Sequence, residues 1–221
     1  MAPEAGLTVA VTGPTGTFGR ALMPLLQEDD QVDRVIGIAR RPFDPAEHGW
    51  TKMEYRRGDV RDADALRTAF DGVDVVVHLA FLILSGGRKK TQAINIEGTQ
   101  NTFGAAADAG AKRFVYASSI AAYGFHRDNP IGITEDWATR PADRLFYAQE
   151  KAELEHRLQQ EAATHPQTAL YLLRPRSSWA PTRSAPRSTS PPCSGRRCVE
   201  SAQHCGTFRP CRPSCRTCRS S

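Results

Sequence analysis

The chain has 221 residues, of which 40% are hydrophobic and 24% charged, and its formal net charge is +5. These fractions are typical of a soluble protein and exclude a wholly disordered chain, a collagen and a membrane bundle. No apolar run is long enough to span a membrane, and the first residues lack the basic segment and apolar core of a secretory signal, so we expect a cytoplasmic protein without a membrane partner.

The basic charge belongs to the C-terminal part of the chain. Nine arginines against one acid give residues 176–221 a charge of +8, which leaves −3 for residues 1–175. The same segment holds all six cysteines, ten serines and six prolines, but no leucine, isoleucine or lysine. Such a composition cannot bury enough apolar surface to offset the entropy of ordering, so we expect a disordered tail over 176–221.

Three interpretations of this tail remain. Its cysteines contain a single C-x-x-C pair, Cys215 and Cys218, which is weak support for a metal or disulfide module. Its arginines are compatible with nucleic-acid binding by charge alone. The abrupt change in composition favours a third interpretation, out-of-frame translation of a GC-rich gene, which translating the other two reading frames would test. We therefore expect neither a metal site nor a nucleic-acid partner.

Residues 1–175 alternate between strand and helix patterns. Short aliphatic and β-branched runs predict six strands, at 7–11, 32–39, 53–57, 73–79, 114–117 and 168–173. Helical spacing predicts helices at 18–28, which Pro24 interrupts, and at 62–70, 91–109 and 145–164. This order predicts an α/β protein, a Rossmann-type doubly wound parallel sheet in one domain over 1–175.

A glycine-rich loop follows the first predicted strand. Residues 12–19 read TGPTGTFG and space Gly13, Gly16 and Gly19 as G-x-x-G-x-x-G, one residue longer than the common dinucleotide-binding pattern. Glycines here allow a tight turn and the close approach of a pyrophosphate, and the next helix offers free N–H groups at its start. We expect a dinucleotide at this loop; the alternative is a tight turn without a ligand.

The end of the second predicted strand bears on the choice of dinucleotide. An acid at this point would bind the ribose hydroxyls of NAD, but this chain has Arg40 and Arg41 instead. Guanidinium groups pair well with a 2′-phosphate, so we favour NADP(H) over NAD(H). The alternative is that both arginines are solvated loop charges, with Arg40 stacked on the adenine.

A candidate acid/base pair lies in the last predicted helix. Tyr147 and Lys151 are four residues apart and therefore share one helix face. A nearby ammonium favours the phenolate form, which would make Tyr147 a general acid/base. Because Y-x-x-x-K is frequent by chance, the alternative is an amphipathic helix with a half-buried tyrosine and a solvated lysine. Ser118 and Ser119 strengthen the first interpretation, since ligands bind beyond the carboxyl ends of strands.

In this order, the motifs resemble the extended short-chain dehydrogenase/reductase family, in its NAD-dependent epimerase/dehydratase group. The matching stretches together cover about residues 7–175 and are 12–19, 58–62, 76–80, 95–99, 109–119, 147–151 and 173–175. The resemblance implies hydride transfer between the nicotinamide and a substrate carbon that bears a hydroxyl or carbonyl, often in a nucleotide sugar. Tyr147 would exchange the matching proton.

The resemblance also implies roles by position. It implies a catalytic set of Ser119, Tyr147 and Lys151. It also implies cofactor contacts by Gly13, Gly16, Thr17, Phe18, Gly19, Asp59, Val60, Leu79, Ala80, Asn95 and Lys151. Arg40 joins these predicted contacts because of its position after the second predicted strand. We expect Ser118 to be a buried strand-end residue, and His78 and His126 to be structural or loop residues. Homodimers through the helices at 91–109 and 145–164 are a further implication.

The resemblance ends at Pro175, whereas family members continue well beyond this point and build much of the substrate pocket from that part. We therefore expect the cofactor half to be present, the substrate region to be missing, and turnover to be weak. The alternative is a non-catalytic dinucleotide-binding or interaction module. The variant Tyr147→Phe discriminates between the two, because only an enzyme loses its rate.

Overall fold

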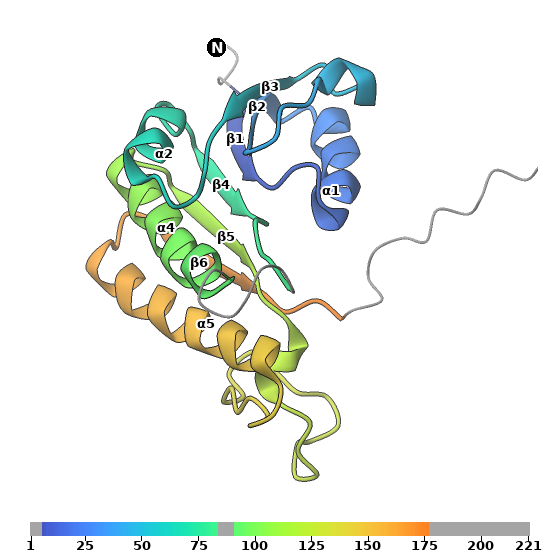
Figure 1. The fold of residues 1–221 in the computed structure, drawn as a ribbon, viewed down its shortest axis with the longest axis vertical. Helices are drawn as coiled ribbons and strands as arrows, with labels where there is room; N and C mark the ends of the chain where they lie inside the picture. Colours follow the sequence, from blue (N-terminus) through green and yellow to red (C-terminus); the bar gives the residue numbers. More distant parts are fainter. Residues whose placement is uncertain (1–5, 84–90, 177–221) are drawn as a thin grey trace, which may run out of the picture. The chain divides into compact units, whose positions relative to one another are not determined.

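The computed structural model describes residues 6–83 and 91–176. Six parallel strands form a sheet in the order β3–β2–β1–β4–β5–β6 (Figure 1). Their bounds are β1 (Leu7–Thr12), β2 (Val32–Ala39), β3 (Met53–Arg57), β4 (Val75–His78), β5 (Arg113–Ala117) and β6 (Ala169–Leu173). All six predicted strands are confirmed, with ends shifted by two residues at most.

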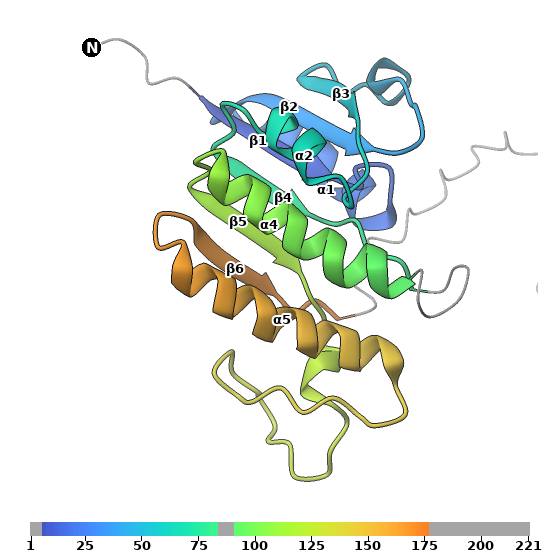
Figure 2. The same cartoon turned by 60° about the vertical axis from the view of Figure 1, so that its left-hand side comes forward.

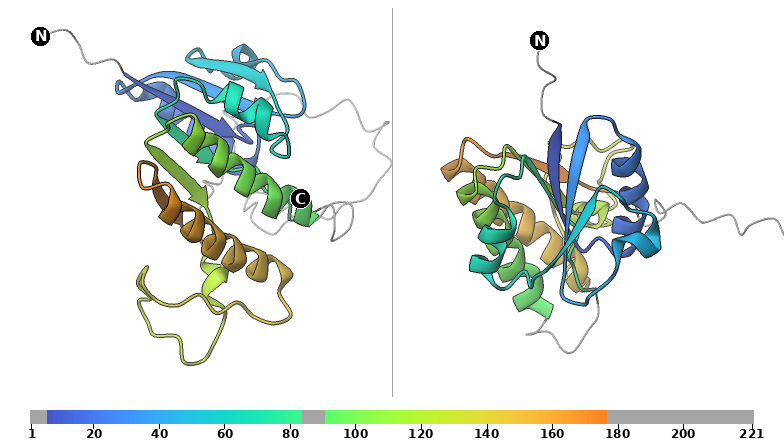
Figure 3. Two further views of the ribbon diagram at one scale, coloured as in Figure 1. Left: turned by 90° about the vertical axis from the view of Figure 1, so that its left-hand side faces the viewer. Right: turned by 90° about the horizontal axis from the view of Figure 1, so that it is seen from above.

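Helices cover both faces of the sheet, as Figure 2 and Figure 3 show. On one face lies α1 (Thr17–Glu28), and on the other lie α2 (Ala63–Ala69), α4 (Gly98–Asp108) and α5 (Phe146–Thr164). The predicted doubly wound α/β sheet of the Rossmann type is therefore confirmed. Pro24 lies inside α1 without ending it. The residue is exposed, so solvent can reach the carbonyl that its missing N–H leaves unbonded.

Three short helical turns complete the described elements: η1 (Pro45–His48), η2 (Ala93–Glu97) and η3 (Ile120–Tyr123). The turn η2 is π-helical and runs directly into α4, so the predicted helix at 91–109 is confirmed but contains a widened turn near its start. None of the described helices is long and apolar enough to cross a membrane.

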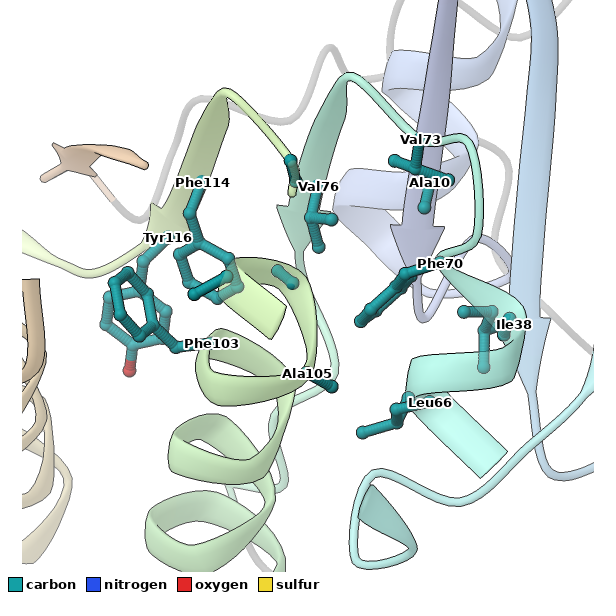
Figure 4. Packing of buried hydrophobic residues seen from close by; sticks show 14 of the residues in the cluster. Ala10, Ile38, Leu66, Phe70, Val73, Val76, Phe103, Ala105, Phe114 and Tyr116 are labelled. Atoms are coloured by element: carbon teal, nitrogen blue, oxygen red, sulfur yellow. The ribbon is translucent and has the colours of Figure 1, made fainter. Parts of the chain in front are cut away.

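Two hydrophobic clusters fix the layers. The larger lies between the sheet and α2, α4 and α5, where the rings of Phe103 and Phe114 meet edge to face, 5.1 Å between centroids (Figure 4). Such a pair adds about 0.5–1.5 kcal/mol to its area burial. The smaller cluster packs α1 and Trp50 against β1 and β2. In the part of the chain that is described, Tyr171 and Leu173 of β6 remain 48% and 54% exposed.

Strand register brings the site residues to one edge of the sheet. Thr12 pairs with His78, and His78 pairs with Tyr116, so β1, β4 and β5 end level with one another. The loops that follow these strands therefore leave from the same edge. Apart from Arg176, the predicted tail lies outside the described residues, so its disorder stays a prediction.

Candidate functional site

The loop between β1 and α1 makes a tight turn that requires glycine. Gly13 has φ +74°, a left-handed conformation that glycine adopts without a steric penalty. Its N–H donates to the carbonyl of Ile38 (3.0 Å), and the N–H of Gly16 donates to the carbonyl of Gly13 (3.1 Å). A Cβ at Gly19 would lie 2.5 Å from the carbonyl carbon of Pro14, so a larger residue does not fit there. The first turn of α1 therefore lies directly against the loop.

A cavity of about 400 Å³ lies over the ends of β1, β2 and β4. Its lining includes many of the predicted cofactor contacts: Gly13, Gly16, Arg40, Val60, Leu79 and Ala80, together with Arg41. Asp59 does not line this cavity. Its carboxylate accepts hydrogen bonds from Arg61 at 2.7 and 3.0 Å, and these bonds lower the pKa of Asp59.

A second cavity of about 190 Å³ adjoins the first along the glycine loop. The two share Gly13, Gly16, Leu79 and Phe81 in their linings, so we treat them as one crevice. The second cavity is lined in addition by Thr17, Phe18, Gly19, Ile83, Ala117, Ser118, Tyr147 and Lys151. The structure thus brings the glycine loop and the Tyr147–Lys151 pair, far apart in the sequence, to the same crevice.

Lys151 is buried, with 3% of its surface exposed. Its Nζ donates to the hydroxyl of Tyr116 (3.1 Å) and to the carbonyl of Ala117 (2.6 Å), and it lies 3.6 Å from the ring centroid of Phe81. Burial lowers the pKa of Lys151 to about 7, although Glu155 and Glu150 oppose this shift. The alternative of a solvated lysine is therefore wrong.

Tyr147 is half-buried at the wall of the second cavity. Its ring meets Phe81 edge on, 5.7 Å between centroids, and the Nζ of Lys151 lies 5.9 Å from its ring centroid. A phenol at such a wall, next to a buried amine, has the chemistry to exchange a proton with a ligand in the crevice.

The two serines after β5 have different partners. Ser118 is buried and donates to the carboxylate of Glu155, as expected for a strand-end residue. The hydroxyl oxygen of Ser119 accepts from the N–H of Ala121 (3.1 Å) at the start of η3, which leaves its own proton to donate. Of the two, Ser118 lines the second cavity and Ser119 does not. The catalytic role of Ser119 stays a prediction.

Asn95 lies away from the cavity walls. Its fully buried amide brackets the backbone of Leu82, with its Oδ1 accepting from the N–H and its Nδ2 donating to the carbonyl, both at 2.9 Å. The same Nδ2 donates to Glu150 (2.9 Å). Asn95 therefore fixes the segment after β4 to α5, and its neighbour Ile94 reaches the first cavity.

His78 and His126 have the structural and loop positions expected of them. His78 is buried, bonded through Nδ1 to Thr12 (2.8 Å) and through Nε2 to Thr99 (3.0 Å). Burial lowers the pKa of His78 to about 3, and the nearby charge of Lys151 acts in the same direction. The ring therefore stays neutral and links β1, β4 and α4. His126 is exposed and bonded to the carbonyl of Arg140.

An ion pair between the buried Glu155 and the partly buried Arg174 has no counterpart among the predicted residues. The guanidinium of Arg174 binds both carboxylate oxygens of Glu155 (Nη2 to Oε2, 2.6 Å) and also the hydroxyl of Tyr123 (2.5 Å). This pair ties the end of β6 to the middle of α5. The sequence gives one signal for this pair: Glu155 lies one helical turn after Lys151 and therefore shares the helix face that packs on the sheet.

The sheet order, the glycine loop before α1 and the crevice over the strand ends define a dinucleotide-binding domain of the Rossmann type. The model of the NAD dependent epimerase/dehydratase family matches residues 9–200. The chain belongs to this family of enzymes, as its motifs indicate. The match continues past Pro175, which corrects the expectation that the resemblance stops there.

Known proteins of this group are similar to the chain. The 3 beta-hydroxysteroid dehydrogenase/Delta 5-->4-isomerase of vaccinia virus is 36% identical over 130 residues, which are 56% of this chain and 37% of the viral protein. A short-chain dehydrogenase/reductase superfamily protein from Agrobacterium tumefaciens, solved with bound NAD, has a TM-score of 0.62 and 31% identity over 76% of this chain and 48% of its own. The dTDP-glucose 4,6-dehydratase DesIV from Streptomyces venezuelae, also solved with NAD, has a TM-score of 0.64 and 25% identity over 76% and 55%. The chain thus spans about half the length, or less, of these proteins.

Proposed function

We propose that this chain binds a nicotinamide dinucleotide in the crevice and uses Tyr147 and Lys151 for proton transfer at a substrate hydroxyl or carbonyl carbon. The observation that carries the proposal is the second cavity, which the glycine loop and the Tyr147–Lys151 pair line together. When bound, the dinucleotide supplies the hydride acceptor or donor. The similarity to a dehydratase and a dehydrogenase supports this reaction class.

The residues of the crevice fit such a group. Because Gly19 has no Cβ, the glycine loop packs directly against the first turn of α1. Thr17, Phe18 and Gly19 of this turn line the second cavity, where their N–H groups would face a pyrophosphate. Thr17, Phe18 and Gly13 would line the same stretch, Val60 the adenine end, and Leu79 and Ala80 the ribose. Asp59 binds the side chain of Arg61, and Asn95 binds the backbone of Leu82. These two residues would therefore affect the cofactor indirectly, by fixing the shape of the cavity walls.

NADP(H) is the dinucleotide that we favour. Arg40 and Arg41 both line the first cavity, and a guanidinium there can pair with a 2′-phosphate. The solved relatives described above hold NAD, so the test compares the two dinucleotides directly.

In the proposed reaction, Tyr147 gives or takes the proton of the substrate oxygen. The ammonium of Lys151 stabilises negative charge on the phenol oxygen, and Phe81 shields both side chains from water. Ser119 would donate a hydrogen bond to the same substrate oxygen. The substrate that we propose is a small molecule that carries a hydroxyl or carbonyl carbon, such as a nucleotide sugar. The assembly that we propose is a homodimer through α4 and α5.

The binding test is calorimetric titration of the chain with NADPH and with NADH. We expect tighter binding of NADPH and a loss of about tenfold in NADPH affinity for Arg40→Ala, because a charge-assisted hydrogen bond contributes about 1.5–3 kcal/mol. Affinity for NADH is expected to change little. The matched control is Arg127→Ala, an exposed arginine in the loop between β5 and α5. Equal losses for both dinucleotides would contradict the assignment of Arg40.

A second candidate function is dinucleotide binding without turnover, which the position of Ser119 outside the lining of the second cavity favours. A hydride-transfer assay over nucleotide sugars and simple alcohols separates the two. An enzyme loses nearly all of its rate in Tyr147→Phe while keeping its dinucleotide affinity. A binding module shows no rate in the wild type and the same affinity in both proteins.

A further inference from the structure

Beside the proposed catalytic pair, a second tyrosine contacts the amine. Tyr116 lies in β5, is 1% exposed, and is surrounded by the larger hydrophobic cluster (Figure 4). Its hydroxyl accepts a hydrogen bond from the Nζ of Lys151 (3.1 Å), and the same Nζ lies 4.6 Å from its ring centroid. Burial raises the pKa of Tyr116 well above its usual value, so the phenol stays neutral and acts as a hydrogen-bond partner.

The ring of Tyr116 is itself held in place. It stacks on His78, with 6.1 Å between centroids and 22° between planes, and His78 is bonded to Thr12 and Thr99. On the crevice side, the face of Phe81 lies 3.6 Å from the Nζ of Lys151, within the range of a cation–π contact. The amine is therefore enclosed between a fixed phenol in β5 and an aromatic ring at the crevice wall.

We propose that Tyr116 is a positioning residue, which with Phe81 fixes the ammonium of Lys151 at the floor of the crevice beside Tyr147. This inference rests on the proposed function, in which Lys151 acts on Tyr147, and on the cofactor contact by Lys151 that the family resemblance implies. The lysine keeps one place because two of its donors are bonded, to Tyr116 and to the carbonyl of Ala117. Without the phenol oxygen, the buried charge loses one of these two acceptors.

Other charged and titratable groups also face this amine and act on its protonation. From α5 come Tyr147, Glu150 and Glu155, of which the two acids favour the ammonium. From β4 comes His78, which is neutral. Arg174, from the end of β6, is bonded to Glu155 and reduces the effect of that carboxylate. Because Tyr116→Phe changes none of these groups, a shift in that variant reports on the phenol oxygen.

The direct test is an NMR titration of the lysine side chains, without any cofactor. The chain has five lysines, so the signal of Lys151 can be assigned by its loss in Lys151→Met. We expect a pKa of about 7 in the wild type and a value lower by about one unit in Tyr116→Phe, since a hydrogen bond to the charged form is lost. The control Tyr123→Phe removes a comparable buried hydroxyl that bonds Arg174 instead, and should leave the titration unchanged.

An equal titration in Tyr116→Phe and the wild type, or an equal shift in Tyr123→Phe, would overturn the proposal. If Tyr116→Phe fails to fold, Phe81→Leu tests the same enclosure from the partly exposed crevice wall. We expect this change to lower the pKa of Lys151 as well, because it removes the cation–π contact. An unshifted titration in that variant would count against the enclosure.

A second readout connects the lysine to the cofactor. At pH 7 the charged fraction of Lys151 is expected to fall from about one half to about one tenth in Tyr116→Phe, which predicts about fivefold weaker NADPH binding. At pH 5.5 the difference should nearly vanish, because most of the amine is charged in both proteins. A loss that is independent of pH would indicate a merely structural role. If the wild type binds no dinucleotide, the proposed function fails, while the NMR titration still decides the role of Tyr116.

Discussion

Substitution of Gly19 by alanine tests whether the glycine loop must lie against α1. The added Cβ would lie 2.5 Å from the carbonyl carbon of Pro14 and 2.6 Å from the carbonyl oxygen of Gly13, whereas ordinary contacts begin at 3.4 Å. The loop and the helix must therefore separate by about 1 Å, since both opposing groups are backbone. Overpacking of this kind costs about 1–3 kcal/mol in unfolding free energy. A displacement of this size at a binding loop is also expected to weaken NADPH binding at least about tenfold.

The assay combines urea unfolding with NADPH titration on the same protein preparations. The matched control is Gly104→Ala in α4, where an added Cβ meets no atom within 4 Å. That change is expected to raise the unfolding free energy by about 0.5–1 kcal/mol through helix propensity, with NADPH affinity unchanged. If Gly19→Ala is folded and binds NADPH as tightly as the wild type, the close approach at the loop does not serve the cofactor.

Two further predictions concern buried charge. Because the folded pKa of His78 is about 3 against an ordinary 6.5, the folded state binds fewer protons, and stability is lost as the pH falls below 6.5. We expect His78 to lower the unfolding free energy, measured in urea, by about 3 kcal/mol when the pH falls from 7.5 to 4.5. The decline should be smaller in His78→Gln, and an equal decline would contradict the low pKa assigned to His78. Arg174→Met should lower the unfolding free energy by about 3–5 kcal/mol, since it leaves the buried carboxylate of Glu155 uncompensated. Glu155→Gln should cost less, because Arg174 is partly exposed and keeps its bonds to Tyr123 and Glu135. The double variant should recover part of this loss, and strictly additive losses would argue against the pair.

The fold could be predicted from the sequence because its strands are short apolar runs and its crossovers leave little choice of topology. The run at 32–39, for example, coincides with β2, and the helix at 145–164 differs from α5 by one residue. Pro24 was expected to interrupt α1, but an exposed proline removes one hydrogen bond from a helix that packing against the sheet holds in place.

The motif spacing also indicated that the glycine loop, Tyr147 and Lys151 belong together, but it did not indicate that Ser119, Asp59 and Asn95 lie outside the lining of the crevice. It did not indicate the environment of Lys151, because the residues that enclose the amine come from different elements. Tyr116 is fixed by strand pairing, and Phe81 directly precedes Leu82, whose backbone Asn95 brackets. Such contacts depend on the path of the loop after β4, which no local pattern determines. The same holds for Arg174, whose partner Glu155 lies on another element.

The most direct test of the central claim is a structure of the chain in complex with NADPH. We expect the pyrophosphate to lie at the first turn of α1, beside Gly16 and Gly19, and the nicotinamide to face the hydroxyl of Tyr147. A dinucleotide bound elsewhere, or a nicotinamide that lies away from this hydroxyl, would contradict the claim.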